Sequence, residues 1–198
     1  MRSALILTGG NATRAGGLPK YDFSFGGRSF LERQIEILRS CTDEICIICR
    51  NKDQERLFHT IPDVRITHDK IPGQGPAGGI QAGSCAVSGE YFFVTACDMP
   101  FLSCDVINYL FERAEGYDAA VPLWEDGKIE PLCAVFKRES VNAFFEGQME
   151  RRLTRFIGQL HTRYIPVEEI QRLDPELNVF QNINDFKTFS KIEKINSD

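Results

Sequence analysis

Short apolar runs, separated by polar segments, dominate the hydrophobic pattern of the chain. The runs do not alternate strictly between apolar and polar positions, and continuous apolar runs are typical of strands that are covered on both faces. They predict strands at residues 3–7, 43–49, 65–68, 91–96, 119–122, 131–136 and 163–167. Residues 125–128 have the composition of a hairpin turn between two of these strands.

Segments with the periodicity of helices lie between the apolar runs. Ser29 and Glu32 have the spacing of a capping box. The helix that they open has an apolar face formed by Leu31, Ile35 and Leu38. Further helices are predicted at residues 52–58, 80–87, 105–114, 139–145 and 151–157, and a last one follows a cap at Asn184 or Asp185. This alternation predicts a single α/β domain with three α/β/α layers and a mainly parallel sheet.

The composition is that of an ordinary globular protein, with 42% hydrophobic and 26% charged residues. The 23 basic and 28 acidic side chains give a net charge of −5, which disfavours binding to nucleic acids. No apolar run approaches the ~20 residues of a membrane span, and the run at residues 4–7 is too short for the core of a signal peptide. We therefore expect a cytoplasmic protein that binds neither nucleic acid nor a membrane.

Seven cysteines are present, and their odd number argues against a disulfide framework. Cys46 and Cys49 form a C-x-x-C pair, a spacing that is found in zinc and redox sites. The pair lies in a predicted strand, however, where positions three apart point to opposite faces. We therefore interpret these two thiols as buried core residues and not as metal ligands.

A glycine-rich loop directly follows the first predicted strand, at the end where parallel α/β sheets bind their ligands. Residues 9–20 contain four glycines together with Arg14 and Lys20. Glycines let backbone N–H groups approach phosphate oxygens, and the two cations add positive charge. The loop matches neither the Walker A motif nor G-x-G-x-x-G. We favour a phosphate-binding loop over the alternative, a surface turn with incidental cations.

Single polar residues follow three other predicted strands. Asp98 would either cap the next helix or hold Mg²⁺, and the phosphate loop favours Mg²⁺. Asp69 would either bind a nucleotide or cap the following turn, and Asn51 is equally ambiguous. The sequence therefore predicts a ligand site at the carboxyl ends of the strands, but it leaves open which of these residues bind the ligand.

Two features of the second half of the chain have simpler structural interpretations. Arg151, Arg152 and Arg155 form a cation cluster, which is typical of a solvated helix surface. If the segment is helical, Arg151 and Arg155 share a face. Trp124 is the only tryptophan, and we expect it to pack in the core and not to stack on a ligand.

Five segments together resemble the molybdenum cofactor guanylyltransferases, often called MobA. The most specific is LTGGNATRAGGLPK at residues 7–20, and the others are GPAGGI at 75–80, ACDMPF at 96–101, EPLCAVF at 130–136 and NIN at 182–184. They occur in the family's order and at its spacing. The resemblance implies a Rossmann-like nucleotidyltransferase fold. It also implies transfer of GMP from Mg²⁺-bound GTP to molybdopterin bearing molybdenum, with release of pyrophosphate.

The resemblance further implies roles for individual residues. Residues 1–100 would form a GTP-binding half and residues 101–198 an acceptor-binding half. Arg14, Lys20 and Asp98 would be catalytic, with Asp98 as the Mg²⁺ ligand. The residues that would bind GTP are Leu7, Thr8, Gly9, Gly10, Lys20, Asn51, Asp69 and Asp98, and those that would bind the acceptor are Arg151, Arg152, Asn182 and Asn184. The implied partners are GTP, molybdenum-molybdopterin and proteins that accept the finished cofactor.

The sequence is also compatible with other functions. Within the same fold, the alternatives are an adenosylcobinamide-phosphate guanylyltransferase, a molybdopterin cytidylyltransferase and a sugar-phosphate nucleotidyltransferase. The segments at residues 75–76 and 98–100 favour the molybdenum branch. A nucleotide-sensing module without turnover is an alternative of a different class, and the presence of Arg14, Lys20 and Asp98 argues against it.

Overall fold

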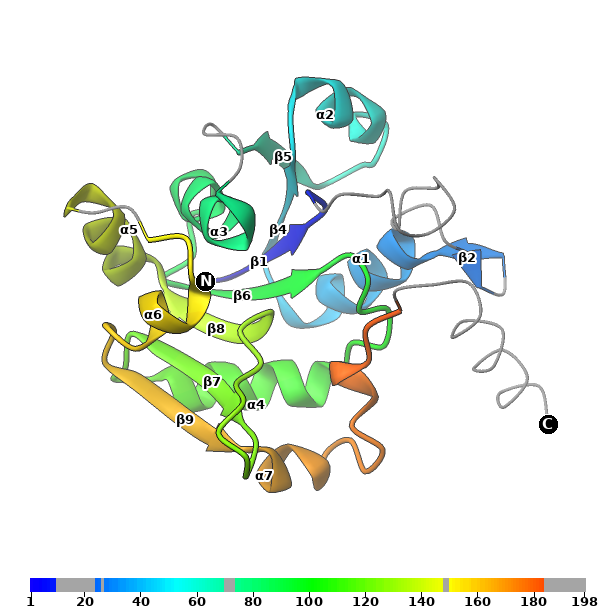
Figure 1. Cartoon of the computed structure of the whole chain (residues 1–198). Coiled ribbons are helices and arrows are strands. Elements are labelled where there is room, and N and C mark those ends of the chain that lie inside the picture. The colour runs from blue at the N-terminus through cyan, green and yellow to red at the C-terminus, as the bar shows by residue number, and fades with distance from the viewer. Residues whose placement is uncertain (10–23, 26, 70–73, 148–149, 184–198) are drawn as a thin grey trace.

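A single large sheet organises the molecule (Figure 1). The computed structural model describes residues 1–9, 24–25, 27–69, 74–147 and 150–183, and within them seven strands form this sheet in the order β5-β4-β1-β6-β8-β7-β9. The strands are β1 (Arg2–Leu7), β4 (Glu44–Cys49), β5 (Arg65–His68), β6 (Tyr91–Ala96), β7 (Ala119–Leu123), β8 (Cys133–Lys137) and β9 (Thr162–Pro166). β8 runs antiparallel to both neighbours, and the other neighbouring pairs are parallel. The predicted mainly parallel sheet is therefore confirmed.

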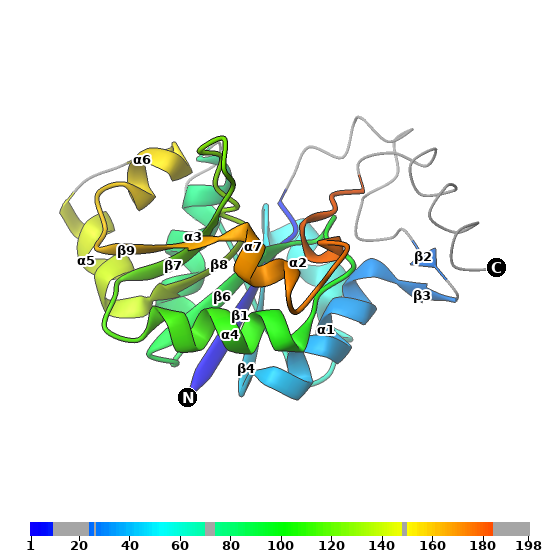
Figure 2. The same ribbon diagram turned by 90° about the horizontal axis from the view of Figure 1, so that it is seen from below.

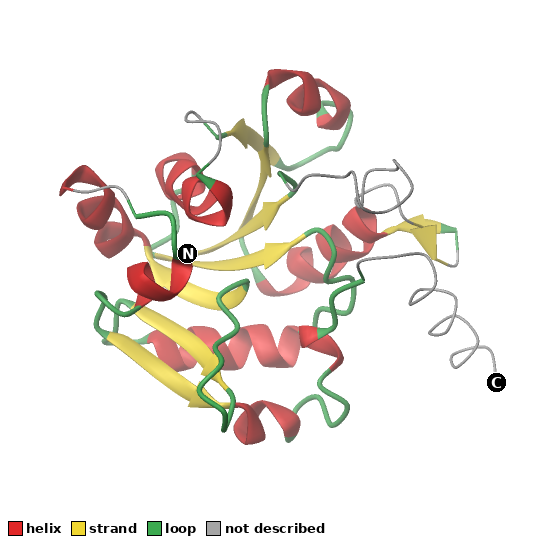
Figure 3. Ribbon diagram, viewed as in Figure 1, coloured by secondary structure: helices red, strands yellow, loops and turns green. Residues whose placement is uncertain are grey.

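Helices cover both faces of the sheet (Figure 2). α1 (Phe30–Cys41), α4 (Cys104–Ala114) and α7 (Val167–Gln171) pack on one face, and α3 (Gly75–Ala86), α5 (Arg138–Gly147) and α6 (Leu153–Ile157) pack on the other. α2 (Lys52–Phe58) contacts β4 and β5, and the short 3-10 helix η3 (Asn178–Phe180) follows α7. A separate ribbon of β2 (Ser24–Phe25) and β3 (Arg28–Ser29) precedes α1 (Figure 3). The predicted three-layer α/β/α architecture is confirmed.

Two apolar cores, one on each side of the sheet, explain why the strands lack strict alternation. Ala4 and Ile6 of β1 belong to the core beneath α1 and α4, whereas Leu5 belongs to the core beneath α3. All three side chains are fully buried. A strand that is covered on both faces needs no polar positions toward solvent, so its sequence is continuously apolar.

The capping box predicted at the start of α1 is present. Ser29 Oγ accepts a hydrogen bond from Glu32 N at 3.2 Å, and Glu32 Oε2 accepts one from Ser29 N at 2.7 Å. The hydrogen bond from the Ser29 backbone lowers the pKa of the Glu32 carboxyl, because it stabilises the charged form. The box defines where α1 begins and hence which of its side chains face the sheet.

The start of α3 predicted at residue 80 is wrong. The helix begins at Gly75 with Pro76 in its first turn, so the glycine-rich segment is largely helical. Glycine is intrinsically unfavourable in helices, but tertiary packing overrides that preference here. A Cβ atom at Gly83 would lie only 2.5 Å from Leu5 Cδ1. The missing side chain lets α3 approach β1 closely.

We expect Gly83→Ala to lower the free energy of unfolding by about 1–3 kcal/mol, the usual cost of overpacking a filled core. The added methyl group would also meet Ile48 Cδ1 at 3.1 Å, and both Leu5 and Ile48 are buried. Urea denaturation measures the change. Gly147→Ala is the matched control, because nothing lies within 4 Å of a Cβ at that position. An equal loss in both variants would contradict close packing at Gly83.

The helix predicted around the arginine cluster is shorter than expected. α6 begins at Leu153, and the backbone of Arg152 is extended. Arg152 N donates a hydrogen bond to Glu150 Oε1 at 2.8 Å, and such local side-chain contacts compete with helix formation. Arg151 therefore lies ahead of the helix, and the helical face that it was predicted to share with Arg155 does not exist.

Candidate active site

The carboxyl ends of four parallel strands meet at one edge of the sheet, and backbone hydrogen bonds hold the segments that leave them. Cys97 N donates to Leu7 O at 3.1 Å, and Asp69 N donates to Cys49 O at 3.0 Å. The strands follow one another in the order β5, β4, β1 and β6 (Figure 1). The structure therefore brings the segments after Leu7, after His68 and after Ala96 to the same edge.

The end of β1 is held by side chains from its neighbours. Thr8 is buried, and its Oγ1 donates to Ile48 O at 2.9 Å. Gln54 Nε2 donates to Thr8 O at 3.0 Å, and Gln54 Oε1 accepts from Arg50 N at 2.7 Å. Gln54 thus joins the segment after β1 to the segment after β4. Gln54 was not predicted from the sequence, although its spacing from Asn51 resembles a capping box and could have indicated it.

Asn51 forms the N-cap of α2. Its backbone is extended, and its Oδ1 accepts a hydrogen bond from Gln54 N at 3.0 Å. Among the residues that the structure describes, its amide nitrogen forms no hydrogen bond. The capping role is therefore shown, and the predicted contact to GTP is compatible with it.

The carboxylate of Asp69 lies against the first turns of α3. A Cβ at Gly78 would lie 2.7 Å from Asp69 Oδ2 and 2.7 Å from Gln74 Cβ, so a larger residue would displace both. A carboxylate near a helix N-terminus is stabilised by the helix dipole. The two predicted roles of Asp69, binding a nucleotide and capping the following turn, would therefore both be carried out beside the N-terminus of α3. Gly78 was not predicted from the sequence, because the need for a glycine at this position arises only from the neighbouring element.

Asp98 lies in a tight turn directly after β6. Met99 N donates to Ala96 O at 3.1 Å and closes the turn. Gln34 of α1 reaches the same turn, and its Nε2 donates to Ala96 O at 2.7 Å and to Met99 O at 2.8 Å. The side chain of Asp98 is half-buried. A single acidic side chain is therefore presented on a turn whose two ends are both held.

The segment after η3 lies beside this turn. Ile183 N donates to Asp98 O at 2.8 Å, and the Ile183 side chain is fully buried. Asn182, one residue earlier, is exposed. The structure thus brings the predicted acceptor residue Asn182 next to the predicted metal ligand, although the two are far apart in the sequence.

A hairpin between β7 and β8 covers the adjoining part of the edge. Gly127 has a φ of +83°, in agreement with the predicted turn. Trp124 Nε1 donates to Glu130 Oε1 at 2.8 Å, and Lys128 Nζ lies 2.8 Å from the same oxygen. The rings of Trp124 and Phe180 pack with centroids 5.6 Å apart. Trp124 is partly buried and packs against the core, while the expectation that it does not stack on a ligand stays a prediction.

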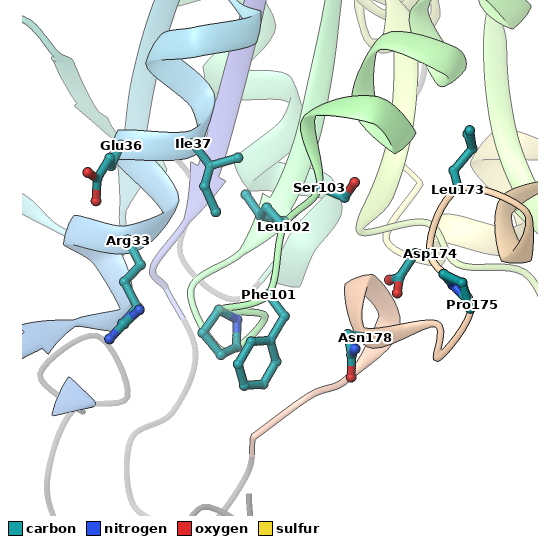
Figure 4. Close-up of a pocket in the computed structure, with 11 residues that line it drawn as sticks. Arg33, Glu36, Ile37, Phe101, Leu102, Ser103, Leu173, Asp174, Pro175 and Asn178 are labelled. Carbon is teal, nitrogen blue, oxygen red and sulfur yellow. The ribbon is translucent and has the colours of Figure 1, made fainter. Parts of the chain in front are cut away.

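A pocket of about 490 Å³ lies between α1, the segment after Asp98 and the segment before η3 (Figure 4). Arg33, Phe101 and Asp174 are among its lining residues. None of the predicted GTP-binding residues that the structure describes lines this pocket. Its lining residues Pro100 and Asn178 are near Asp98 and Asn182 in the sequence, but neither Asp98 nor Asn182 lines it.

Comparison with known proteins identifies the family. The MobA-like NTP transferase domain matches residues 4–163 of the chain. The chain belongs to this family. A Methanosarcina acetivorans protein named probable molybdenum cofactor guanylyltransferase is 37% identical over 193 residues, which cover 92% of this chain and 86% of that protein. A protein of the same name from Natronomonas pharaonis is 37% identical over 161 residues, which cover 80% of this chain and 79% of that protein.

Solved structures agree with membership of the MobA-like family. Molybdopterin-guanine dinucleotide biosynthesis protein A from Archaeoglobus fulgidus matches at a TM-score of 0.84 and 27% identity, covering 100% of this chain and 99% of that chain. The bifunctional IspDF from Campylobacter jejuni matches at a TM-score of 0.72 and 13% identity, covering 96% of this chain and 53% of that chain, and shares the fold alone. The predicted resemblance and the predicted nucleotidyltransferase fold are both confirmed.

Some residues that the MobA-like resemblance singled out lie outside the described residues. They are Gly10, Arg14, Lys20 and Asn184, and the last predicted helix lies there too. Arg151 and Arg152 are exposed just before α6, which contacts α3. Roles in ligand binding stay predictions for all of these and for Leu7, Thr8, Gly9, Asn51, Asp69, Asp98 and Asn182.

The paired cysteines of this MobA-like chain belong to its two cores. Cys49 lies in the core beneath α1 and Cys46 in the core beneath α3, so the predicted opposite orientation is confirmed. Burial raises the pKa of each thiol to about 12. No group of three metal-binding side chains occurs among the residues that the structure describes. In that same part of the chain, no helix has both the length and the apolar character that crossing a membrane requires.

We expect iodoacetamide to alkylate Cys85 long before Cys46 and Cys49 in the folded protein at about pH 8. The thiolate is the reactive species, and the raised pKa of both buried thiols leaves them protonated at this pH. Cys85 is exposed. Mass spectrometry of the digested protein measures the labelling, with urea-unfolded protein as the control in which all three react. Fast labelling of Cys46 or Cys49 without urea would contradict the burial.

Proposed function

We propose that this chain transfers GMP from GTP to molybdopterin bearing molybdenum, with Mg²⁺ as its metal ion, and releases pyrophosphate. The observation that carries this proposal is the 37% identity over 193 residues with the Methanosarcina acetivorans protein named probable molybdenum cofactor guanylyltransferase. The arrangement at the carboxyl edge of the sheet supports it, because that edge is where α/β sheets bind nucleotides.

The strand order supports an extended nucleotide across this edge. β5 and β6 are separated by β4 and β1, so at about 4.8 Å per strand their ends lie roughly 14 Å apart. The glycine-rich loop follows β1 and Asp98 follows β6, which favours the triphosphate on that side. The nucleoside would then lie toward β4 and β5, near Asn51 and Asp69. Residues 1–100 supply all of these groups and would form the GTP-binding half.

The residues at the end of β6 fit a Mg²⁺ ion. Asp98 supplies a half-buried carboxylate at this edge, and a carboxylate oxygen is the hard donor that this ion prefers. Mg²⁺ usually takes one or two carboxylates and completes its shell with phosphate and water, so a single acidic side chain suffices. When bound, the ion would neutralise charge on the triphosphate. Asp98 would hold it, and the turn would set the position of Asp98.

The acceptor requires no protein base. A phosphate monoester has a second pKa near ~6 and is therefore already nucleophilic at neutral pH. The chain would act by positioning the two substrates and by stabilising charge at the α-phosphate and on pyrophosphate. Arg14 and Lys20 are the cations that we propose for this task. Asn182, which the fold brings beside Asp98, supports the acceptor-binding half at residues 101–198.

We expect GTP with Mg²⁺ to raise the Tm of the protein more than ATP, CTP or UTP does. A ligand at about 100 times its Kd adds roughly 2.7 kcal/mol to the free energy of unfolding, which a thermal melt resolves easily. Differential scanning fluorimetry with each nucleotide measures the preference.

Two outcomes would favour the alternatives. A larger shift with CTP would assign the chain to the molybdopterin cytidylyltransferases. Normal GTP binding without release of pyrophosphate, in the presence of molybdenum-molybdopterin, would support a nucleotide-sensing module.

A further inference from the structure

Gln34 is a polar residue on the apolar face of α1. Its neighbours on that face, among them Leu31, Ile35 and Leu38, are buried, and Gln34 itself is 0% exposed. Burial of an amide costs free energy unless its groups form hydrogen bonds, so an apolar residue is the usual choice at such a position. The presence of glutamine therefore needs a specific reason.

The contacts of Gln34 supply that reason. Its Nε2 donates to Ala96 O at 2.7 Å and to Met99 O at 2.8 Å, so both amide protons are used. These two carbonyl groups lie at the two ends of the turn that carries Asp98. One side chain thereby links the two ends of the turn, in addition to the hydrogen bond from Met99 N to Ala96 O.

The carbonyl oxygen of the Gln34 amide has no comparable role. Gln34 Oε1 is buried, and it has no hydrogen-bond partner in the part of the chain that the structure describes. Leaving a buried acceptor unpaired is unfavourable. A methionine or leucine would fill the same space without that cost, so what glutamine adds at this position is its pair of donors toward the Asp98 turn.

We propose that Gln34 is a positioning residue for nucleotidyl transfer, which acts by holding the Asp98 turn in the conformation that presents its carboxylate to the metal ion. This inference rests on the proposed function of Asp98 as a metal ligand. Residues that orient a metal ligand typically contribute a large part of the affinity for the ion, because the ligand is then arranged before the ion binds.

The test is Gln34→Met, which keeps the length of the side chain and removes both donors. We expect the Kd of Mn²⁺ in the presence of GTP to rise about tenfold to a hundredfold, the usual effect of losing such an outer contact. Electron paramagnetic resonance of Mn²⁺ measures that Kd directly. Calorimetric titration with GTP in EDTA is expected to show unchanged nucleotide binding, and kcat with Mg²⁺ is expected to fall while the KM for the acceptor stays constant.

Ser3→Ala is the matched control for stability. Ser3 is also 0% exposed and also forms two hydrogen bonds, donating to Glu44 Oε2 at 2.8 Å and accepting from Gly89 N at 3.0 Å. It lies at the opposite end of β1 from the candidate site. This variant is expected to lose stability and to bind Mn²⁺ and GTP like the wild type.

The outcomes separate the inference from the function on which it rests. If Gln34→Met binds Mn²⁺ normally while Asp98→Ala does not, Gln34 has only a structural role and the inference fails. If Asp98→Ala also binds Mn²⁺ normally, the proposed metal site itself is wrong. Gln34→Leu replaces Gln34→Met if the latter does not fold. If neither folds where Ser3→Ala does, Gln34 supports the core as a whole and the inference is overturned.

Discussion

Asp98→Ala is expected to reduce guanylyl transfer by roughly a thousandfold, because loss of a metal ligand at a phosphoryl site removes several kcal/mol of transition-state stabilisation. The fold should persist, because the hydrogen bonds described above for this turn use its backbone groups. Gln34 donates to Ala96 O and Met99 O, and Met99 N donates to Ala96 O. Ile183 N donates to the backbone oxygen of Asp98. Release of pyrophosphate measures the transfer rate, and urea denaturation measures the stability of the variant.

Asp105→Ala is the matched control for the loss of an acidic side chain. Asp105 is exposed in the first turn of α4, a few residues after the Asp98 turn, and takes no part in the candidate site. Its replacement should leave transfer unchanged. Near-normal turnover of Asp98→Ala would show that the metal assignment is wrong. Unfolding of that variant would show that Asp98 acts as a cap for the segment that follows it.

Lys20→Ala is expected to weaken GTP binding and to slow transfer by about a hundredfold, since an ammonium at the triphosphate neutralises charge in both the ground state and the transition state. The contrasting variant replaces Arg151 and Arg152 by alanine together. It should leave the Kd for GTP nearly unchanged and raise the KM for the anionic acceptor. Calorimetric titration with GTP and initial-rate kinetics with molybdenum-molybdopterin distinguish the two patterns.

The structure adds one constraint to this second experiment. Both arginines are exposed and lie just before α6, so replacing them should not disturb the core. Equal stability of the double variant and the wild type is therefore the control. A large loss of GTP affinity in the double variant would show that the two groups of cations serve one site, and the division into two halves would be contradicted.

The elements that local patterns predicted well are those whose signals lie in neighbouring residues. β1 was expected at residues 3–7 and is Arg2–Leu7, and the capping box of Ser29 and Glu32 opens α1 as predicted. A strand that is covered on both faces is continuously apolar, and a capping box needs only two residues three positions apart, so both signals are local in the sequence. Where a neighbouring element decides, the prediction failed. Glycine is unfavourable in helices, so α3 was expected to begin only at residue 80. It begins at Gly75 instead, and a Cβ at Gly79 would lie 3.1 Å from Leu7 Cδ2 of β1, so the glycine there lets the helix pack closely on the sheet.

The candidate site shows the same division. The sequence by itself determined that Asp69 and Asp98 follow strands and that the carboxyl ends of parallel strands share an edge. It also determined the family, because five motifs occur in one order. Only the tertiary structure decided that Ile183 binds the backbone of Asp98 and that Gln34 holds the turn from a different helix. Those contacts join residues far apart along the chain, and they depend on the strand order and on helix packing, which no local pattern of hydrophobic and polar positions contains.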